Sequence, residues 1–338
     1  MPLAAALLAA VAATPSPSPA VRTVPVTVVN FPRAETDMYF ADEVKRGAFG
    51  KFLHRRELVP VDQQAVVRPN RDTLYSTAIF DLDAGRVTLT LPDPGDRFMS
   101  LQLIDEDHYV PMVAYGGGTY VLLREHVGTP YVMAVIRILV NPLDPADLEK
   151  ARALQDQITV EQPAVGTFTV PNWDPVSQKK VRSALLTLGE TLPDLRKAFG
   201  SPSQVDPTIH LIGTAMGWGG NPDKEAMYLN VTPPKNDGTT VHKLTVRYVP
   251  VNGFWSISVY NAQGYFQKNL YGAYSLNNKT VTYAQDNSAT IQFGGCDGKV
   301  PNCLPIMPNW NYTVRLYRPN PEVLNGGWKF PEAVPVSK

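Results

Sequence analysis

A cluster of ionisable side chains follows directly after an apolar run near residue 100. The apolar run 101–104 is followed by Asp105, Glu106, Asp107, His108 and Tyr109. An aspartate beside a histidine is a common proton-transfer pair, and a neighbouring tyrosine can donate to a developing negative charge. Two carboxylates can also divide the roles of acid and base between them. We therefore predict that Asp107, His108 and Tyr109 are catalytic and that Asp105 binds substrate.

The geometry of this cluster depends on where the preceding strand ends. Side chains alternate between the two faces of a strand, so in an unbroken strand Asp107 and His108 point to opposite sides. They can cooperate only if the strand breaks at or before Asp107. The alternative is structural, with acids at a strand end and His108 hydrogen-bonded to the backbone.

A second polar stretch, residues 68–75, leads into another predicted strand. Asn70 and Asp72 favour a turn, and the planar guanidinium of Arg71 is suited to a carboxylate or phosphate. We predict that Arg71 and Tyr75 are catalytic, with Arg71 as the partner of an anion or oxyanion, and that Asn70 binds substrate. A buried Arg–Asp network that braces the strand is the structural alternative.

Four further residues are predicted to bind substrate. His54 and Arg55 belong to a basic triplet suited to an anion entrance opposite the acidic cluster, although a solvated loop has the same pattern. Tyr265 and Asn277 lie among aromatic and amide residues of the kind that hold sugars in β-sandwich modules. The histidines are scattered without metal-ligand spacing, so we expect no metal and no cofactor.

The elements that must position these residues are mainly strands. β-branched and aromatic runs separated by Gly and Pro dominate residues 73–140 and 243–317, and Asp-Pro pairs at 144–145 and 174–175 begin two helices between them. This pattern predicts a mainly β fold with accessory helices, in which two β-sandwich or jelly-roll-like domains are joined by a helical segment.

Composition and the N-terminal residues bear on location and partners. The 338 residues include 31 basic and 31 acidic side chains, which gives no support for nucleic-acid binding. Residues 1–20 combine an apolar core with a Pro/Ser-rich leader, and we interpret them as a candidate signal peptide that is too short for a stable membrane span. Cys296 and Cys303 flank a short turn, and in a secreted or periplasmic protein we expect them to form a disulfide.

Several motifs occur in a defined order along the chain. They include NFPRAETD at 30–37, NRDTLYS at 70–76, GFWSISVYN at 253–261 and NCLPI at 302–306. In this order they resemble a bacterial family that carries two paired domains of unknown function, DUF1254 and DUF1214. The resemblance implies a DUF1254-like β domain at 24–170, a helical connector at 171–220 and a DUF1214-like jelly-roll domain at 221–335. It implies little chemistry.

Together these features predict an exported hydrolase or lyase that acts on a small polar or saccharide-like ligand in a cleft of the N-terminal domain. The alternative is a non-catalytic envelope module that binds carbohydrate or protein through the stretch from Tyr265 to Asn278. A deep, converging cleft would favour the enzyme, and a shallow aromatic groove on the second domain would favour the binding module. A homo-oligomer is compatible with both.

Overall fold

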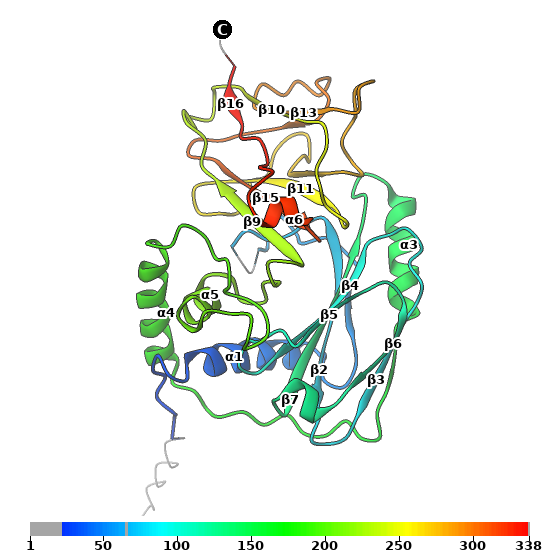
Figure 1. Cartoon of the computed structure of the whole chain (residues 1–338), viewed down its shortest axis with the longest axis vertical. Helices are drawn as coiled ribbons and strands as arrows, with labels where there is room; N and C mark the ends of the chain where they lie inside the picture. The colour runs from blue at the N-terminus through cyan, green and yellow to red at the C-terminus, as the bar shows by residue number, and fades with distance from the viewer. Residues whose placement is uncertain (1–21, 65–66, 337–338) are drawn as a thin grey trace, which may run out of the picture.

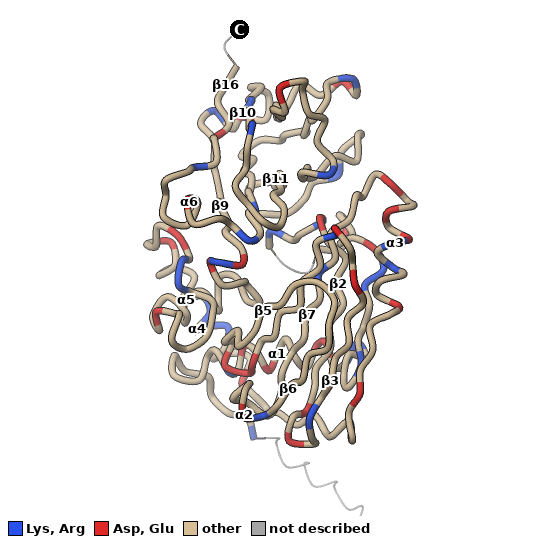
Figure 2. Tube along the Cα trace, turned by 45° about the vertical axis from the view of Figure 1, so that its right-hand side comes forward, with Lys and Arg blue, Asp and Glu red and all other residues tan. Residues whose placement is uncertain are grey.

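The computed structural model describes residues 22–64 and 67–336, which form two β-rich domains stacked end to end (Figure 1). The predicted mainly β fold with accessory helices is confirmed. Residues 1–20, interpreted above as a signal peptide and leader, lie outside the described residues. Charged side chains of both signs are interspersed over both domains (Figure 2).

The N-terminal domain is a sandwich of two antiparallel sheets. Its larger sheet has the strand order β1-β2-β7-β4-β5, formed by Leu53–Arg55, Thr73–Asp81, Tyr131–Leu139, Met99–Asp105 and Met112–Tyr115. Its smaller sheet has the order β6-β3-β8, formed by Gly118–Leu122, Val87–Leu91 and Thr159–Glu161. Because neighbouring strands of the larger sheet are all antiparallel, their paired residues lie directly opposite one another.

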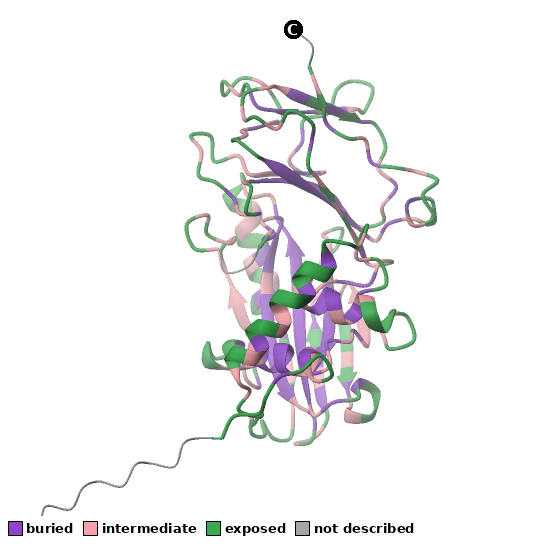
Figure 3. Cartoon of the chain, turned by 90° about the vertical axis from the view of Figure 1, so that its left-hand side faces the viewer, coloured by how far each residue is buried: buried purple, intermediate pink, exposed green. Residues whose placement is uncertain are grey.

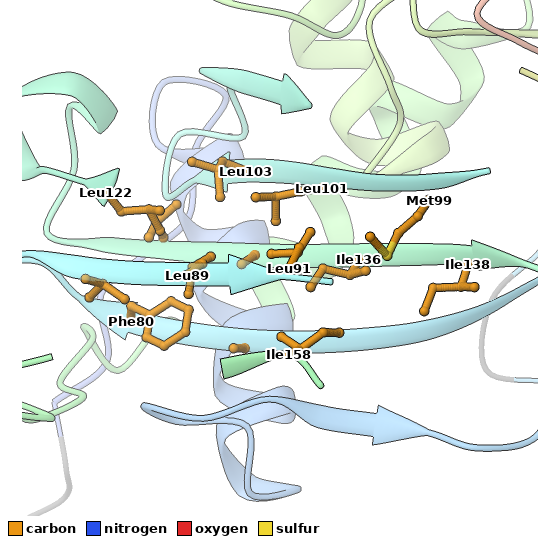
Figure 4. Close-up of a cluster of buried hydrophobic side chains, with 14 of the residues drawn as sticks. Phe80, Leu89, Leu91, Met99, Leu101, Leu103, Leu122, Ile136, Ile138 and Ile158 are labelled. Atoms are coloured by element: carbon orange, nitrogen blue, oxygen red, sulfur yellow. The ribbon is translucent and has the colours of Figure 1, made fainter. Parts of the chain in front are cut away.

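The hydrophobic core of this domain fills the space between its two sheets (Figure 4). Phe80, Leu101 and Ile136 point into it from the larger sheet, and Leu89 comes from the smaller one. All four are fully buried, and each such burial contributes roughly 1.5–3 kcal/mol. Because side chains alternate along a strand, this core also determines which residues lie on the opposite face of the larger sheet.

Helices cover that opposite face. α1 (Phe31–Lys45) lies across it, and α4 (Pro175–Gly189) and α5 (Pro207–Gly217) pack against α1 (Figure 1). Phe40 of α1 packs on Ile79 of the sheet. Figure 3 shows that the outward faces of the helices are exposed, whereas the strands beneath them are buried.

The predicted Asp-Pro helix starts are present. The carboxylate of Asp174 accepts hydrogen bonds from the N–H groups of Val176 and Ser177, and proline occupies the first turn of α4. Asp144 caps α3 (Pro145–Asp156) in the same way. The remaining helices, α2 (Arg124–Val127) and α6 (Pro321–Leu324), are single turns. Within residues 22–64 and 67–336, no helix is long and apolar enough to cross a membrane.

The C-terminal domain is a second sandwich. Its sheets have the orders β14-β13-β10-β16 and β12-β11-β15-β9. The first is formed by Cys303–Leu304, Ala289–Phe293, His242–Val246 and Val334–Pro335, and the second by Ser275–Asn277, Trp255–Tyr260, Asn311–Tyr317 and Ala226–Val231. Trp255 lies in the core between them. The predicted disulfide between Cys296 and Cys303 is present.

The two domains meet on the outer face of the sheet that contains β11 and β15. The Tyr260 hydroxyl donates to the carbonyl oxygen of Pro69 over 2.8 Å. Beside this contact, the ring of Phe254 lies 4.9 Å from that of Phe98 and 4.2 Å from that of Tyr317, measured between centroids. The upper end of the larger N-terminal sheet is therefore enclosed between the domains.

Candidate functional site

One row of side chains crosses all five strands of the larger sheet on its helix-covered face. Cross-strand pairing joins Arg55 to Tyr75, Tyr75 to Arg137, Arg137 to Ser100 and Ser100 to Tyr115. Directly paired residues of neighbouring strands share a face, so all five side chains point to the same side. We call these five residues the Tyr75 row.

Arg137 occupies the centre of the Tyr75 row and is only 7% exposed. Its Nη1 donates to Oε1 of Gln102 over 2.6 Å, and its guanidinium carbon lies 5.4 Å from the centre of the Tyr75 ring. Among the described residues, no carboxylate oxygen lies within 4.0 Å of its guanidinium nitrogens. Its charge therefore acts on neutral acceptors and on the Tyr75 phenol.

One amide connects phenols of the two domains. Nδ2 of Asn70 donates to the hydroxyl oxygen of Tyr75 at 3.2 Å and to that of Tyr317 at 3.3 Å. Burial acts to raise the pKa of Tyr75, but the Arg137 charge and hydrogen bonds outweigh it and hold that pKa below its ordinary value. Burial, together with the neighbouring phenol of Tyr228, raises the pKa of Tyr317 well above its ordinary value. The site thus combines a phenol that ionises readily with one that stays protonated.

The strand break that the acidic cluster requires is present, because β4 ends at Asp105. Oδ1 of Asp105 accepts hydrogen bonds from the N–H groups of Asp107 and Tyr109, and His108 adopts a left-handed φ of 66°. The turn nevertheless separates the predicted catalytic pair. Asp107 binds Arg33 through an Nη2–Oδ2 contact of 2.8 Å, whereas His108 points inward and is fully buried.

Both ring nitrogens of His108 are engaged in hydrogen bonds. Nε2 accepts from the N–H of Gly219 at 2.8 Å, so Nδ1 carries the proton and donates to Oγ1 of Thr214 at 2.9 Å. Burial, with the nearby His210 adding to it, lowers the pKa of His108 well below its ordinary value. The carbonyl oxygen of Gly219 in turn accepts from Nη2 of Arg137 at 3.4 Å. His108 therefore holds the loop that contacts the Tyr75 row.

A buried carboxyl that sequence patterns did not single out lies close to the acidic turn. Asp37 of α1 is 1% exposed, and its Oδ2 accepts from Nε1 of Trp173 at 2.8 Å. Burial, reinforced by the charge of Glu106, raises the pKa of Asp37 to about 7. Burial also raises the pKa of Asp105 to about 7. In the part of the chain that the structure describes, no group of three or more His, Cys, Asp or Glu residues could hold a metal ion.

Three other predicted site residues lie where the C-terminal domain packs on the loop before β2. Arg71 donates to the carbonyl oxygen of Val59 and stacks over the ring of Tyr274, 5.3 Å from its centre. Asn277 donates to Oδ1 of the fully buried Asp72 at 3.2 Å. Tyr265 is half-buried, and its N–H donates to the side chain of Asn261. The contacts of Arg71 and Asn277 brace the domain junction.

His54 and Arg55 do not form a joint entrance, because adjacent residues of β1 point to opposite faces. Nδ1 of His54 lies 2.8 Å from Oγ of Ser76 on the sandwich side of the sheet. Arg55 lies on the helix-covered side and donates to the carboxylate of Glu43 on α1. Only Arg55 therefore belongs to the Tyr75 row.

Two residues that carry the site, Arg137 and Tyr317, were not predicted. Arg137 lies within the otherwise apolar, fully buried strand β7, and a charged residue in such a strand is a signal because it needs a buried partner. Tyr317 offers no such signal, since tyrosine is common in strands. Its role depends on the docking of the domains.

The fold and the site define a two-domain β-sandwich protein with a tyrosine–arginine site at the domain junction. Residues 49–162 match the family model described as a protein of unknown function (DUF1254), and residues 228–321 match the one described as a protein of unknown function (DUF1214). The chain belongs to the two-domain family of unknown function that these domains define, as its motifs implied. No curated protein matches it.

Two solved structures are similar to this chain. The VPA0106 protein from Vibrio parahaemolyticus has a TM-score of 0.70 at 17% sequence identity, over 92% of this chain and 98% of that one. An uncharacterized protein from Burkholderia cenocepacia has a TM-score of 0.50 at 13% identity, over 86% of this chain and 84% of that one. At these identities the likeness shows the fold alone.

Proposed function

We propose that this protein is an exported enzyme, a lyase or hydrolase, that acts on a small polar or saccharide-like acid at the Tyr75 row. The observation that carries the proposal is Tyr75 itself. Its pKa lies below the ordinary value, and it is half-buried between the fully buried neighbours Leu74 and Ser76 on β2. A phenol that ionises readily and keeps some contact with solvent is suited to proton transfer.

The neighbours of Tyr75 favour elimination over hydrolysis. Arg137 supplies a positive charge for a substrate carboxylate and for the negative charge that develops next to it. The Tyr75 phenolate takes the proton from the carbon beside that carboxylate, and the released electron pair forms a C=C bond as the C–O bond at the next carbon breaks. Tyr317, kept protonated by its raised pKa, donates its proton to the leaving oxygen. Asn70 holds both phenols in place.

In this proposal the acidic turn has a supporting role. His108 has no free ring nitrogen, and it reaches Arg137 only through Gly219. The catalytic roles predicted for Asp107, Tyr109 and Arg71 stay untested, and we assign proton transfer to Tyr75 instead. Export, to the periplasm or the outside, is supported by the disulfide between Cys296 and Cys303, because such bonds persist in oxidising compartments.

A non-catalytic binding module is the second candidate. A cavity of about 220 Å³ in the C-terminal domain is lined by Tyr248, Trp255, Asn278 and Tyr283. Aromatic faces and amides are groups that bind sugars. Sugar binding that is lost in Tyr283→Ala and retained in Tyr75→Phe, without turnover of any compound, would favour this candidate.

The enzyme proposal is tested with purified protein and a panel of uronic-acid oligosaccharides and small hydroxy acids. Elimination is followed by the ultraviolet absorbance of the unsaturated product, and hydrolysis by the release of new reducing ends. We expect Tyr75→Phe to lower turnover by roughly 10²–10⁴-fold with little change in melting temperature. Tyr120→Phe, on a strand outside the larger sheet, is the matched control. Full turnover by Tyr75→Phe would overturn the proposal.

A further inference from the structure

A cavity of about 350 Å³ lies between the two domains, and we call it the interdomain groove. The N-terminal domain contributes residues 94–99 and Tyr115 to its wall, and the C-terminal domain contributes Asn278, Lys279 and Arg318. Its volume is within the range of pockets that bind small molecules. Tyr115 also ends the Tyr75 row, so the groove adjoins the site described above.

The charges of the interdomain groove are predominantly positive. Its wall contains Arg97, Lys279 and Arg318 but a single carboxylate, that of Asp96. Arg97 is neutralised by Asp147, which it binds through both guanidinium nitrogens. Among the described residues, no carboxylate lies within 4.0 Å of the side-chain nitrogens of Lys279 or Arg318. The two cations are therefore available to an anion.

Arg318 is held in position without using its hydrogen-bond donors. Its guanidinium carbon lies 4.4 Å from the centre of the Tyr115 ring, and in the described part of the chain its side chain makes no hydrogen bond. Its backbone has a left-handed φ of 52°, which non-glycine residues rarely adopt. The N–H of Arg318 donates to Glu225 and its carbonyl oxygen accepts from Asn252, each at 2.8 Å. Its N–H groups thus remain free for a carboxylate or phosphate.

An amide adds a second kind of contact to the same wall. Oδ1 of Asn278 is buried and has no hydrogen-bond partner among the described residues. A buried acceptor without a donor is costly, and a ligand hydroxyl would satisfy it. We propose that the interdomain groove binds a small anion, a carboxylate or a phosphate ester, that also carries hydroxyl groups. Lys279 and Arg318 bind the anionic group, and Asn278 accepts from a hydroxyl.

The proposal is tested by calorimetric titration of the full chain at low ionic strength. The probes are gluconate, glycerol phosphate and inorganic phosphate, with glycerol as the uncharged reference. Gluconate and glycerol phosphate distinguish a carboxylate from a phosphate ester, and inorganic phosphate measures the anionic group alone. We expect at least one hydroxylated anion to bind, and Lys279→Met and Arg318→Gln each to weaken its binding roughly tenfold.

Lys268→Met, which removes an exposed lysine outside the groove, is the matched control and should bind as the wild type does. Lys279→Met is decisive if Arg318→Gln fails to fold, because Lys279 is exposed and its loss removes no ion pair. Tyr75→Phe should retain binding, since the groove does not depend on the proposed proton transfer. Equal affinities for Lys279→Met and the wild type, or no binding of any probe, would overturn the proposal.

Discussion

The guanidinium carbon of Arg137 lies 5.4 Å from the centre of the Tyr75 ring, and the two residues are direct cross-strand partners on β7 and β2. The positive charge that lowers the pKa of Tyr75 is therefore placed by the register of a buried sheet. A sheet buried on both faces holds such a pair more rigidly than a surface loop does. The predictions below test this pair and the groups that support it.

Arg137→Met should raise the pH at which Tyr75 ionises, because removing the charge removes the main interaction that favours the phenolate. We expect a shift of at least about one pH unit. The measurement is an ultraviolet titration of tyrosinate, with the Tyr75 signal identified as the difference between proteins with and without Tyr75→Phe. Arg124→Met, on the short helix α2, should leave it unchanged. An unaltered Tyr75 titration in Arg137→Met would contradict the assigned cause.

Asp37→Asn should stabilise the protein above neutral pH. Burial raises the pKa of Asp37 from 3.8 to about 7, so between these values the carboxyl is protonated in the folded chain and ionised in the unfolded one. Its contribution is complete below pH 3.8 and is lost as the pH rises towards 7. The advantage of the variant should therefore grow through this window, by at most about 1.4 kcal/mol per pH unit.

Urea unfolding of wild type and Asp37→Asn at several pH values measures this difference. Asp62→Asn, which alters an exposed carboxyl, should show no such trend. A stability difference that is constant from acid to neutral pH would show that Asp37 is already ionised in the folded protein.

His108→Asn should destabilise the fold, by about 1–3 kcal/mol, because the shorter side chain leaves the buried Gly219 N–H or Thr214 hydroxyl without its partner. Asparagine tolerates the left-handed backbone of this position, so the loss reports the hydrogen bonds. Denaturant unfolding gives the free energy, and hydrogen exchange should show faster opening of residues 217–220. His126→Asn is the exposed control. A variant as stable as wild type but without turnover would instead favour the catalytic role of His108.

Replacing both Cys296 and Cys303 with serine should cost roughly 2–2.5 kcal/mol, because the unfolded chain regains the conformations that the closed loop excludes. The measurement is urea unfolding of the oxidised wild type, the reduced wild type and the double variant. The last two should coincide. If the oxidised protein unfolds at the same urea concentration as the double variant, the bond contributes nothing to stability.

Local rules predicted the elements that they govern. The Asp-Pro pairs at 144–145 and 174–175 begin α3 and α4, because capping and a first-turn proline involve only neighbouring residues. The strand break at Asp105 was identified as the condition for cooperation between Asp107 and His108. The inward direction of His108 was not predictable, because it depends on Thr214 of α5 and on Gly219, more than a hundred positions away.

The sequence by itself determined the mainly β class, the helix starts, the disulfide and the family. Only the tertiary structure decided that Arg137 faces Tyr75, and that Asn70 meets Tyr317, 247 positions along the chain. Strand register and domain docking result from many weak packing contacts summed over the whole chain, and no local pattern contains that sum. A shift of one residue in β7 would turn Arg137 to the opposite face of the sheet and remove the site.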